Sequence, residues 1–363
     1  MKKTQRYLGV YYVIMLLFMT AAVVLRTIAC LTELDFKTGY FDGDICITLA
    51  NSFAISGVII CFSYIFMVDK DMKLVASFDN PMTYVPGGAV SVSMLFLAVE
   101  MMRTVASNKE AFLSVFTLSN KAAPMMANAR ITNILTLIIP ILAILGMMNF
   151  LFNALSEKRT DITRASFGII MSVFLTTYAA YLYFSTELPL NAPNKIIDMM
   201  TYLFIAIFFL YETRLSLGRD MWRPYIAFGF ISALLSGYSS LTALIVYFAN
   251  GNNISDSITE NVLTLTLFFF ITARLVLTSK ISDDGKSDMA TAISKMSEYR
   301  LKEMVGETEE ELAYARAEDN NEENGAESTV EDINYTITLI EDQFEAPQIT
   351  ESAEDTTKGE TNE

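Results

Sequence analysis

Residues 224–248 read PYIAFGFISALLSGYSSLTALIVYF, a stretch that contains no charged side chain. Because a helix rises 1.5 Å per residue, about 20 apolar residues cross the roughly 30 Å of hydrocarbon in a bilayer. Stretches of similar character predict seven further spans: 8–31, 45–68, 86–105, 131–154, 165–184, 196–217 and 259–279. The predicted fold is therefore all-α, a polytopic transmembrane helical bundle of about eight spans.

The composition of the chain changes abruptly near Lys280. Residues 281–363 carry 24 Asp or Glu against six Lys or Arg, a net charge of −18, whereas residues 1–280 carry a net charge of +3. Such an acidic segment with few apolar residues buries too little surface to offset the entropy lost on ordering. The sequence therefore predicts a transmembrane helical domain at 1–280, a short amphipathic helix at 281–305 and a disordered acidic cytoplasmic tail at 306–363.

Histidine is absent from the chain. The protein therefore lacks the side chain most used for proton transfer near neutral pH and for binding transition metals, which excludes His-dependent kinases, proteases and haem proteins. Phosphate-binding, dinucleotide-binding and zinc-binding motifs are also absent, and no basic, aromatic-rich patch indicates nucleic-acid binding. We predict no catalytic residues, no metal site and no cofactor, although an enzyme that uses carboxylates alone stays open.

The distribution of Lys and Arg predicts cytoplasmic N- and C-termini, because short cytoplasmic loops are enriched in basic residues. With the N-terminus inside, the basic residues on the cytoplasmic side are Lys2, Lys3, Arg6, Lys70, Lys73, Lys158, Arg159, Arg164, Arg219, Arg223 and Lys280. Residues 103–130 depart from this pattern, since their four basic side chains would lie outside. This segment is an external loop, an interfacial helix or an extra span. The expected location is the cell membrane, with the lipid bilayer as a partner.

Charged side chains within the spans are candidates for function, because a charge in hydrocarbon is costly. The predicted intramembrane polar site comprises Glu100, Asp198, Glu212 and Arg214. A carboxylate at such a depth is protonated, paired with an arginine or exposed to a polar cavity. Pairing would give Glu100 or Glu212 a structural role, and Arg214, near a helix end, could instead reach the lipid headgroups.

A second candidate site lies at the start of the sixth predicted span. Pro189 and Pro193 end the preceding helix, and Asn194 and Lys195 supply polar groups where the next one begins. Helix N-termini attract anions, so we predict that a lipid headgroup or small anion binds at Asn194 and Lys195. A helix cap and turn without a ligand is the alternative.

Residues 165–277 contain a partial repeat with an offset of 60 residues. SVFLTTYAA at 172–180 aligns with SALLSGYSS at 232–240, and Arg214 aligns with Arg274. Duplicated segments are a common way to build a transporter core, but apolar helices also share letters by chance. Both explanations stay open.

Residues 189–200, PLNAPNKIIDMM, and 209–219, FLYETRLSLGR, resemble a set of polytopic membrane proteins of Gram-positive bacteria. The resemblance implies a bacterial eight-span membrane protein and no particular activity. Two functions fit the sequence. The first is a non-enzymatic protein that senses, scaffolds or regulates, with its acidic tail bound to a cytoplasmic protein. The alternative is a transporter or permease accessory subunit, which requires a polar cavity between the last four spans.

Overall fold

The structure is a computed structural model that describes residues 3–278 apart from short segments between helices. The residues outside this description are 1–2, 37, 44, 68–80, 108, 111–123, 156–161, 186–188, 190–191, 217–220, 252–253, 255–256 and 279–363. The amphipathic helix predicted at 281–305 and the disordered tail predicted at 306–363 therefore lie outside the described residues and stay predictions.

The described residues form eight long α-helices and no β-strand. Each helix is long and apolar enough to span a membrane, which confirms the predicted all-α bundle of eight spans. The helices are α1 (Lys3–Thr32), α2 (Ile45–Met67), α3 (Pro81–Ser107), α5 (Pro124–Leu155), α6 (Ile162–Phe184), α7 (Pro193–Ser216), α8 (Trp222–Asn250) and α9 (Ile258–Thr278).

Local sequence signals mark several helix ends. Pro193 is the first residue of α7, where a missing backbone N–H costs nothing. α8 ends at Gly251, whose φ of 71° is accessible to glycine and whose N–H donates to the Tyr247 carbonyl at 2.8 Å. Ser257 caps α9, because its hydroxyl accepts the backbone N–H of Thr259 at 3.1 Å.

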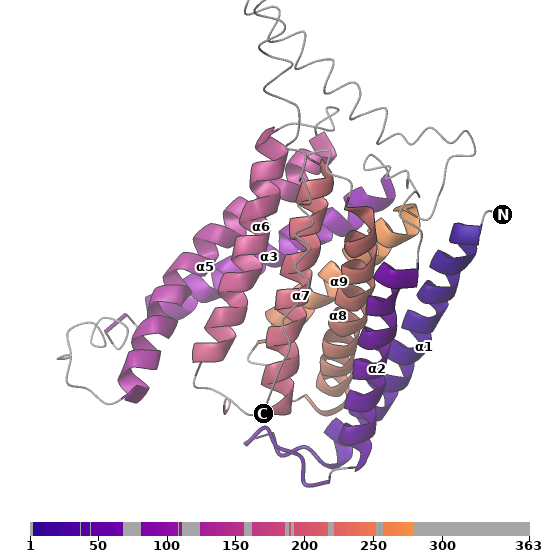
Figure 1. Ribbon diagram of the computed structural model, residues 1–363. Helices are drawn as coiled ribbons and strands as arrows, with labels where there is room; N and C mark the ends of the chain where they lie inside the picture. The colour runs from indigo at the N-terminus through magenta and orange to yellow at the C-terminus, as the bar shows by residue number, and fades with distance from the viewer. Residues whose placement is uncertain are drawn as a thin grey trace, which may run out of the picture. The chain divides into compact units, whose positions relative to one another are not determined.

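Six helices form a closed ring, in which α3, α5, α6, α7, α8 and α9 follow one another and α9 returns to α3 (Figure 1). The hairpin of α1 and α2 lies outside this ring, and among the described ring helices its backbone lies close only to that of α8. α8 therefore belongs both to the ring and to the interface with the hairpin, which makes it the most buried of the eight helices.

Helices that follow one another in the chain alternate in direction, as successive membrane crossings require. Gly87 on α3 lies against Phe150 on α5, whereas Met94 lies against Gly146, so α3 and α5 run antiparallel. Residues 103–107 and 124–130 belong to these two helices, and the external loop, interfacial helix or extra span predicted within 103–130 otherwise lies mostly outside the described residues.

The bundle has two distinct ends. α8 runs parallel to α1, with Tyr12 against Phe230 and Met19 against Gly237, and antiparallel to the next helix in the chain, α9. α1 therefore begins, and α9 ends, at the same end of the bundle, which we call the terminal end. The opposite end, where residues 33–44 connect α1 to α2, is called the first-loop end.

Small residues allow the helices to approach closely around α8. A side chain at Gly229 would contact Leu275 of α9 and Phe208 of α7, and one at Gly237 would contact Met19 of α1. Small residues at such positions are typical of membrane helices, where association depends on close packing rather than on the expulsion of water.

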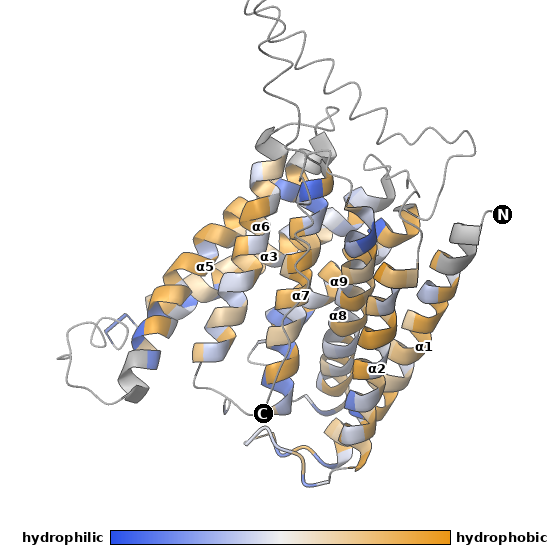
Figure 2. Ribbon diagram, in the orientation of Figure 1, coloured by the Kyte–Doolittle hydropathy of each residue, from blue (hydrophilic) through white to orange (hydrophobic). Residues whose placement is uncertain are grey.

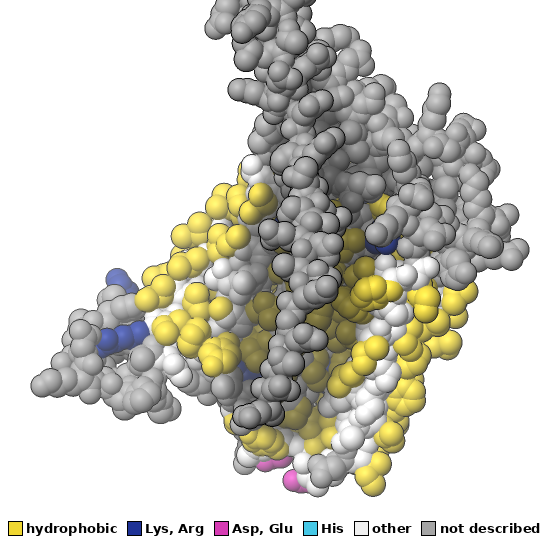
Figure 3. All heavy atoms as spheres, viewed as in Figure 1, with side chains coloured by type: hydrophobic (Ala, Val, Ile, Leu, Met, Phe, Trp, Pro, Cys, Tyr) yellow, Lys and Arg dark blue, Asp and Glu magenta, His cyan; other side chains and the backbone are white. Residues whose placement is uncertain are grey.

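The lateral surface of the bundle is apolar. Hydrophobic residues continue along the length of the helices in Figure 2, and they dominate the visible sides of the described helices in Figure 3. Large apolar side chains with more than half of their surface exposed include Leu17, Ile59, Phe66, Val85, Phe96 and Phe248. A surface of this kind is stable against lipid and unstable against water.

Seven of the eight described helices begin before the predicted spans, five of them by three residues or more. α3 begins at Pro81 instead of 86, α5 at Pro124 instead of 131, and α7 at Pro193 instead of 196. Hydropathy identifies the part of a helix that lies in hydrocarbon, and a helix can continue beyond that boundary. Asn194 and Lys195 consequently lie in the first turn of α7.

Candidate functional site

Arg26 of α1 is a buried cation at the first-loop end, with only 2% of its surface exposed. Its Nη2 donates to Oδ1 of Asn194 on α7 at 2.8 Å, and its guanidinium lies over the ring of Tyr238 on α8, 4.7 Å from the centroid. The Tyr238 hydroxyl donates to Oδ1 of Asn51 on α2 at 2.8 Å. Charge-assisted hydrogen bonding and cation–π attraction thus join four helices.

The first two turns of α7 carry two further buried charges. Nζ of Lys195 donates to the backbone carbonyl of Ser185 at 2.6 Å, and Asp198 accepts a hydrogen bond from the Ser239 hydroxyl on α8. Both charged side chains are buried. We call Arg26, Asn194, Lys195, Asp198, Tyr238 and Ser239 together the α7 polar cluster.

A second acidic group is buried beside this cluster. Glu260, in the first turn of α9, is buried, and both Glu260 and Asp198 lie close enough to the Tyr202 hydroxyl to interact with it electrostatically. Tyr202 also shares a hydrogen bond with Thr264 at 2.9 Å. Two cationic and two acidic side chains therefore meet at this end, so their formal charges balance. Anion binding at Asn194 and Lys195 stays a prediction, and the balanced charges do not require it.

The middle of the ring is aromatic. Phe150 of α5, Phe209 of α7 and Phe270 of α9 contact one another, with ring centroids 5.0 to 5.9 Å apart. These separations are those of stacked and edge-to-face aromatic pairs. Three helices from different sides of the ring thus meet through their side chains, and the rings fill the space between them.

An ion pair joins α7 and α9 in the ring interior, toward the terminal end. Nε of Arg274 on α9 lies 2.9 Å from Oε1 of Glu212 on α7, and both side chains are buried. Tyr225 of α8 lies close enough to both charges to interact with them electrostatically. Because the two charges are opposite, neither Glu212 nor Arg274 is an isolated charge in the membrane.

Glu100 lies in a different part of the bundle. The Ser257 hydroxyl donates to its two carboxylate oxygens at 2.8 and 2.9 Å, and the same hydroxyl caps α9. Glu100 therefore places a negative charge beside the N-terminus of α9, where the helix dipole is favourable. This contact gives Glu100 a structural role between α3 and α9.

Arg214 and Arg274, which the predicted repeat aligns, have different surroundings. Arg214 is half-buried, with its guanidinium 5.8 Å from the centroid of the Tyr211 ring, whereas Arg274 is fully buried beside Glu212. α6 with α7 and α8 with α9 are both pairs of neighbouring helices. The repeat stays a prediction.

The predicted intramembrane polar residues do not form one site. Asp198 lies with Asn194 and Lys195 in the α7 polar cluster, whereas Glu100, Glu212 and Arg214 occupy three other places. The predicted sites lack four residues of this network: Arg26, Asn51, Tyr238 and Ser239. The sequence indicated a role for Arg26, because a charge inside an apolar span is costly. Nothing in the sequence distinguished Tyr238 and Asn51 from other Tyr and Asn residues.

No group of three His, Cys, Asp or Glu side chains in the described part of the chain could hold a metal ion.

The apolar lateral surface and the eight spans define a multi-pass integral membrane protein. Comparison with known proteins finds no matching family model, no similar curated protein and no similar solved structure.

Proposed function

We propose that the protein is a non-enzymatic membrane scaffold or regulator. In this proposal the helical domain holds the chain in the cell membrane, and residues 281–363 bind a cytoplasmic protein. The observation that carries the proposal is that buried side chains join α5, α7 and α9 across the interior of the six-helix ring. Glu212 and Arg274, two of the buried charges there, neutralise each other.

The contacts between α7 and α9 support this proposal over a transporter. The backbones of these helices do not touch, so a polar pathway through the ring would have to pass between them. Three pairs of side chains instead join residues 202–212 of α7 to residues 264–274 of α9: Tyr202 with Thr264, Phe209 with Phe270, and Glu212 with Arg274. These contacts count against the polar cavity that a transporter requires.

The net charge of residues 281–363 supports the proposal that they bind a cytoplasmic protein. Residues 281–363 carry a net charge of −18 and follow α9, so they leave the bundle at its terminal end. Most of the Lys and Arg residues of the connecting segments also belong to this end, which favours a cytoplasmic location by the positive-inside rule. A long acidic segment in the cytoplasm is well suited to fold on, or wrap around, a basic protein partner.

Cysteine accessibility distinguishes a scaffold, whose interior is closed to water, from a transporter, whose interior contains a polar cavity. In a background in which Cys30, Cys46 and Cys61 are replaced by Ala, Thr264→Cys introduces a thiol inside the ring and Thr38→Cys introduces one at an exposed site between α1 and α2. We expect a membrane-impermeant maleimide to label Thr38→Cys and to leave Thr264→Cys unlabelled from both sides. Labelling of Thr264→Cys in intact membranes would support the transporter and contradict the proposal.

In-cell photo-crosslinking tests the tail. A photoreactive amino acid at Tyr335 should give a discrete protein adduct in the cells that naturally produce the chain. A matched variant in which the acidic residues of 331–345 are replaced by Asn or Gln should lose the adduct, because the attraction is electrostatic. Equal adducts from both variants, or none from photoreactive positions throughout 281–363, would count against a charge-dependent partner.

A further inference from the structure

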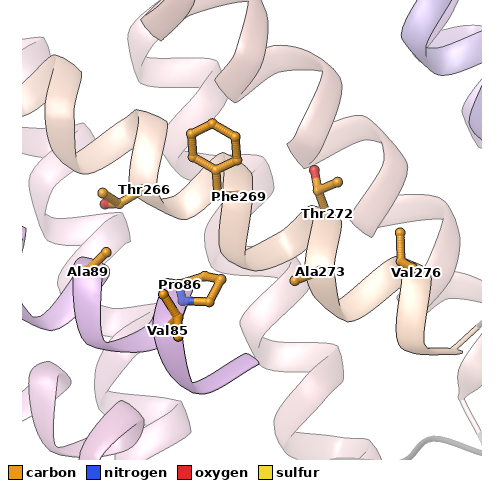
Figure 4. A pocket seen from close by; sticks show the side chains of 8 residues that line it. All are labelled: Val85, Pro86, Ala89, Thr266, Phe269, Thr272, Ala273 and Val276. Carbon is orange, nitrogen blue, oxygen red and sulfur yellow. The ribbon is translucent and has the colours of Figure 1, made fainter. Parts of the chain in front are cut away.

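A groove between α3 and α9 opens on the lateral surface of the bundle (Figure 4). It has a volume of about 450 Å³ and is lined almost entirely by apolar atoms. Its lining comes from Val85, Pro86 and Ala89 of α3 and from Thr266, Phe269, Thr272, Ala273 and Val276 of α9. None of the charged groups described above lines it.

The sequence explains why the surface is hollow at this place. Residues 86–89 of α3 read PGGA, the least bulky run in that helix, and a side chain at Gly88 would meet open space. α9 presents the small Ala273 opposite this run. The side chains of Val85 and Phe269 are 78% and 51% exposed, so they project from the surface beside the small residues at the base of the groove.

The length of the groove matches one leaflet of a bilayer. It extends along α9 from Val276, near the helix end, to Thr266, near the middle of the helix. Ten residues of helix correspond to about 15 Å, which is half of the roughly 30 Å of hydrocarbon. The groove therefore lies in the leaflet at the terminal end and stops near the bilayer midplane.

We propose that this groove binds one acyl chain of a membrane lipid from the leaflet at the terminal end. The lipid headgroup lies beyond Val85 and Val276, and the chain end lies beside Ala89 and Thr266. A flexible hydrocarbon chain fills an irregular apolar hollow and restores the dispersion contacts that an empty one would lose. A transmembrane helix from a partner is about 10 Å wide and crosses both leaflets, so it fits a leaflet-long groove poorly.

Photoreactive phospholipids test the proposal. The purified full-length protein is reconstituted in vesicles of phosphatidylcholine and phosphatidylglycerol that contain a lipid with a diazirine on one acyl chain. Crosslinked residues are then mapped by mass spectrometry. Ile59 of α2 is the matched reference, because it is 63% exposed and lies eight residues from its helix end, much as Phe269 lies nine from the end of α9.

Two results are expected. Labelling of the groove should exceed labelling at Ile59, and a diazirine near the headgroup should label Val276 whereas one near the chain end should label Thr266. Ala273→Leu, which fills the floor, should reduce groove labelling to the level at Ile59, and Ile59→Phe should leave it unchanged. Ala89→Leu repeats the test from α3, and size-exclusion chromatography confirms that each variant is folded.

Other outcomes overturn the proposal. Groove labelling equal to that at Ile59 would show ordinary contact with surrounding lipid, and labelling that ignores the diazirine position would exclude a chain lying along the groove. Disulfide formation between copies that carry Ala273→Cys would identify a second copy as the occupant. The comparison between the groove and Ile59 is made in the unmodified protein, so it holds even where a variant fails to fold.

Discussion

The buried pair of Glu212 and Arg274 gives the sharpest prediction. Its charged atoms are 2.9 Å apart, and the two side chains are 10% and 3% exposed. Glu212→Gln leaves Arg274 as an uncompensated charge inside the ring, and Arg274→Gln does the same to Glu212. Breaking one side of a buried pair typically costs about 3–5 kcal/mol, because the remaining charge stays desolvated.

The double variant Glu212→Gln/Arg274→Gln removes both charges together. Because the desolvation penalty of both ions disappears with their attraction, we expect it to cost much less than the sum of the two single variants. The difference is the coupling energy of the pair, and residues in contact commonly show couplings of about 0.5–3 kcal/mol. The double variant should therefore cost about 0.5–3 kcal/mol less than the sum of the two single costs.

Reversible unfolding in mixed detergent micelles measures these free energies. The four proteins are titrated with sodium dodecyl sulfate and followed by the fluorescence of Trp222, the single tryptophan of the chain. Trp222 is buried in the first turn of α8, so its emission reports the loss of helix packing. Additive costs in the double variant, or single variants each costing below about 1 kcal/mol, would refute the view that these charges are desolvated and paired.

Three further predictions use the same unfolding measurement. Arg26→Gln should cost about 2 kcal/mol, because it removes a charge-assisted hydrogen bond and a cation–π contact, and wild-type stability would contradict the role given to Arg26. Gly168→Ala should cost about 1–3 kcal/mol, since its methyl group would clash with a buried threonine of α7, whereas Gly88→Ala faces open space and should cost nothing. Ser257→Ala should cost more than Glu100→Gln, because the serine both caps α9 and donates to Glu100, and the reverse order would exclude that double role.

The fold was largely predictable from the sequence because apolar length is a strong physical signal. The eight predicted spans correspond one by one to the eight described helices. Helix ends were less predictable, as at Pro124, where α5 begins seven residues before the predicted span. Asn128 and Arg130 reduce the hydropathy of that turn without preventing a helix, since backbone hydrogen bonding continues outside hydrocarbon.

The arrangement of the buried charges was not predictable from a single sequence. Arg26 and Asn194 are separated by 168 residues, and nothing in either span identifies the other. Glu212 and Arg274 were both visible as charges near helix ends, but their pairing depends on α7 and α9 facing each other across the ring. The predicted repeat instead aligned Arg274 with Arg214. Charge inside an apolar span shows that a partner is needed, and only the packing of the helices shows which one.

The position of the α1–α2 hairpin on α8 has a consequence for biosynthesis. The hairpin is made first, but Asn194 and Tyr238, the groups that accompany Arg26, are made at least 168 residues later. At about 5–20 residues per second, the ribosome needs roughly 8–35 s to reach them. During that interval the guanidinium of Arg26, near the end of α1, must be hydrated at the lipid–water boundary. It loses this hydration water only when the last four helices enter the membrane. Assembly of this protein therefore ends with the withdrawal of one arginine of its earliest helical hairpin from water.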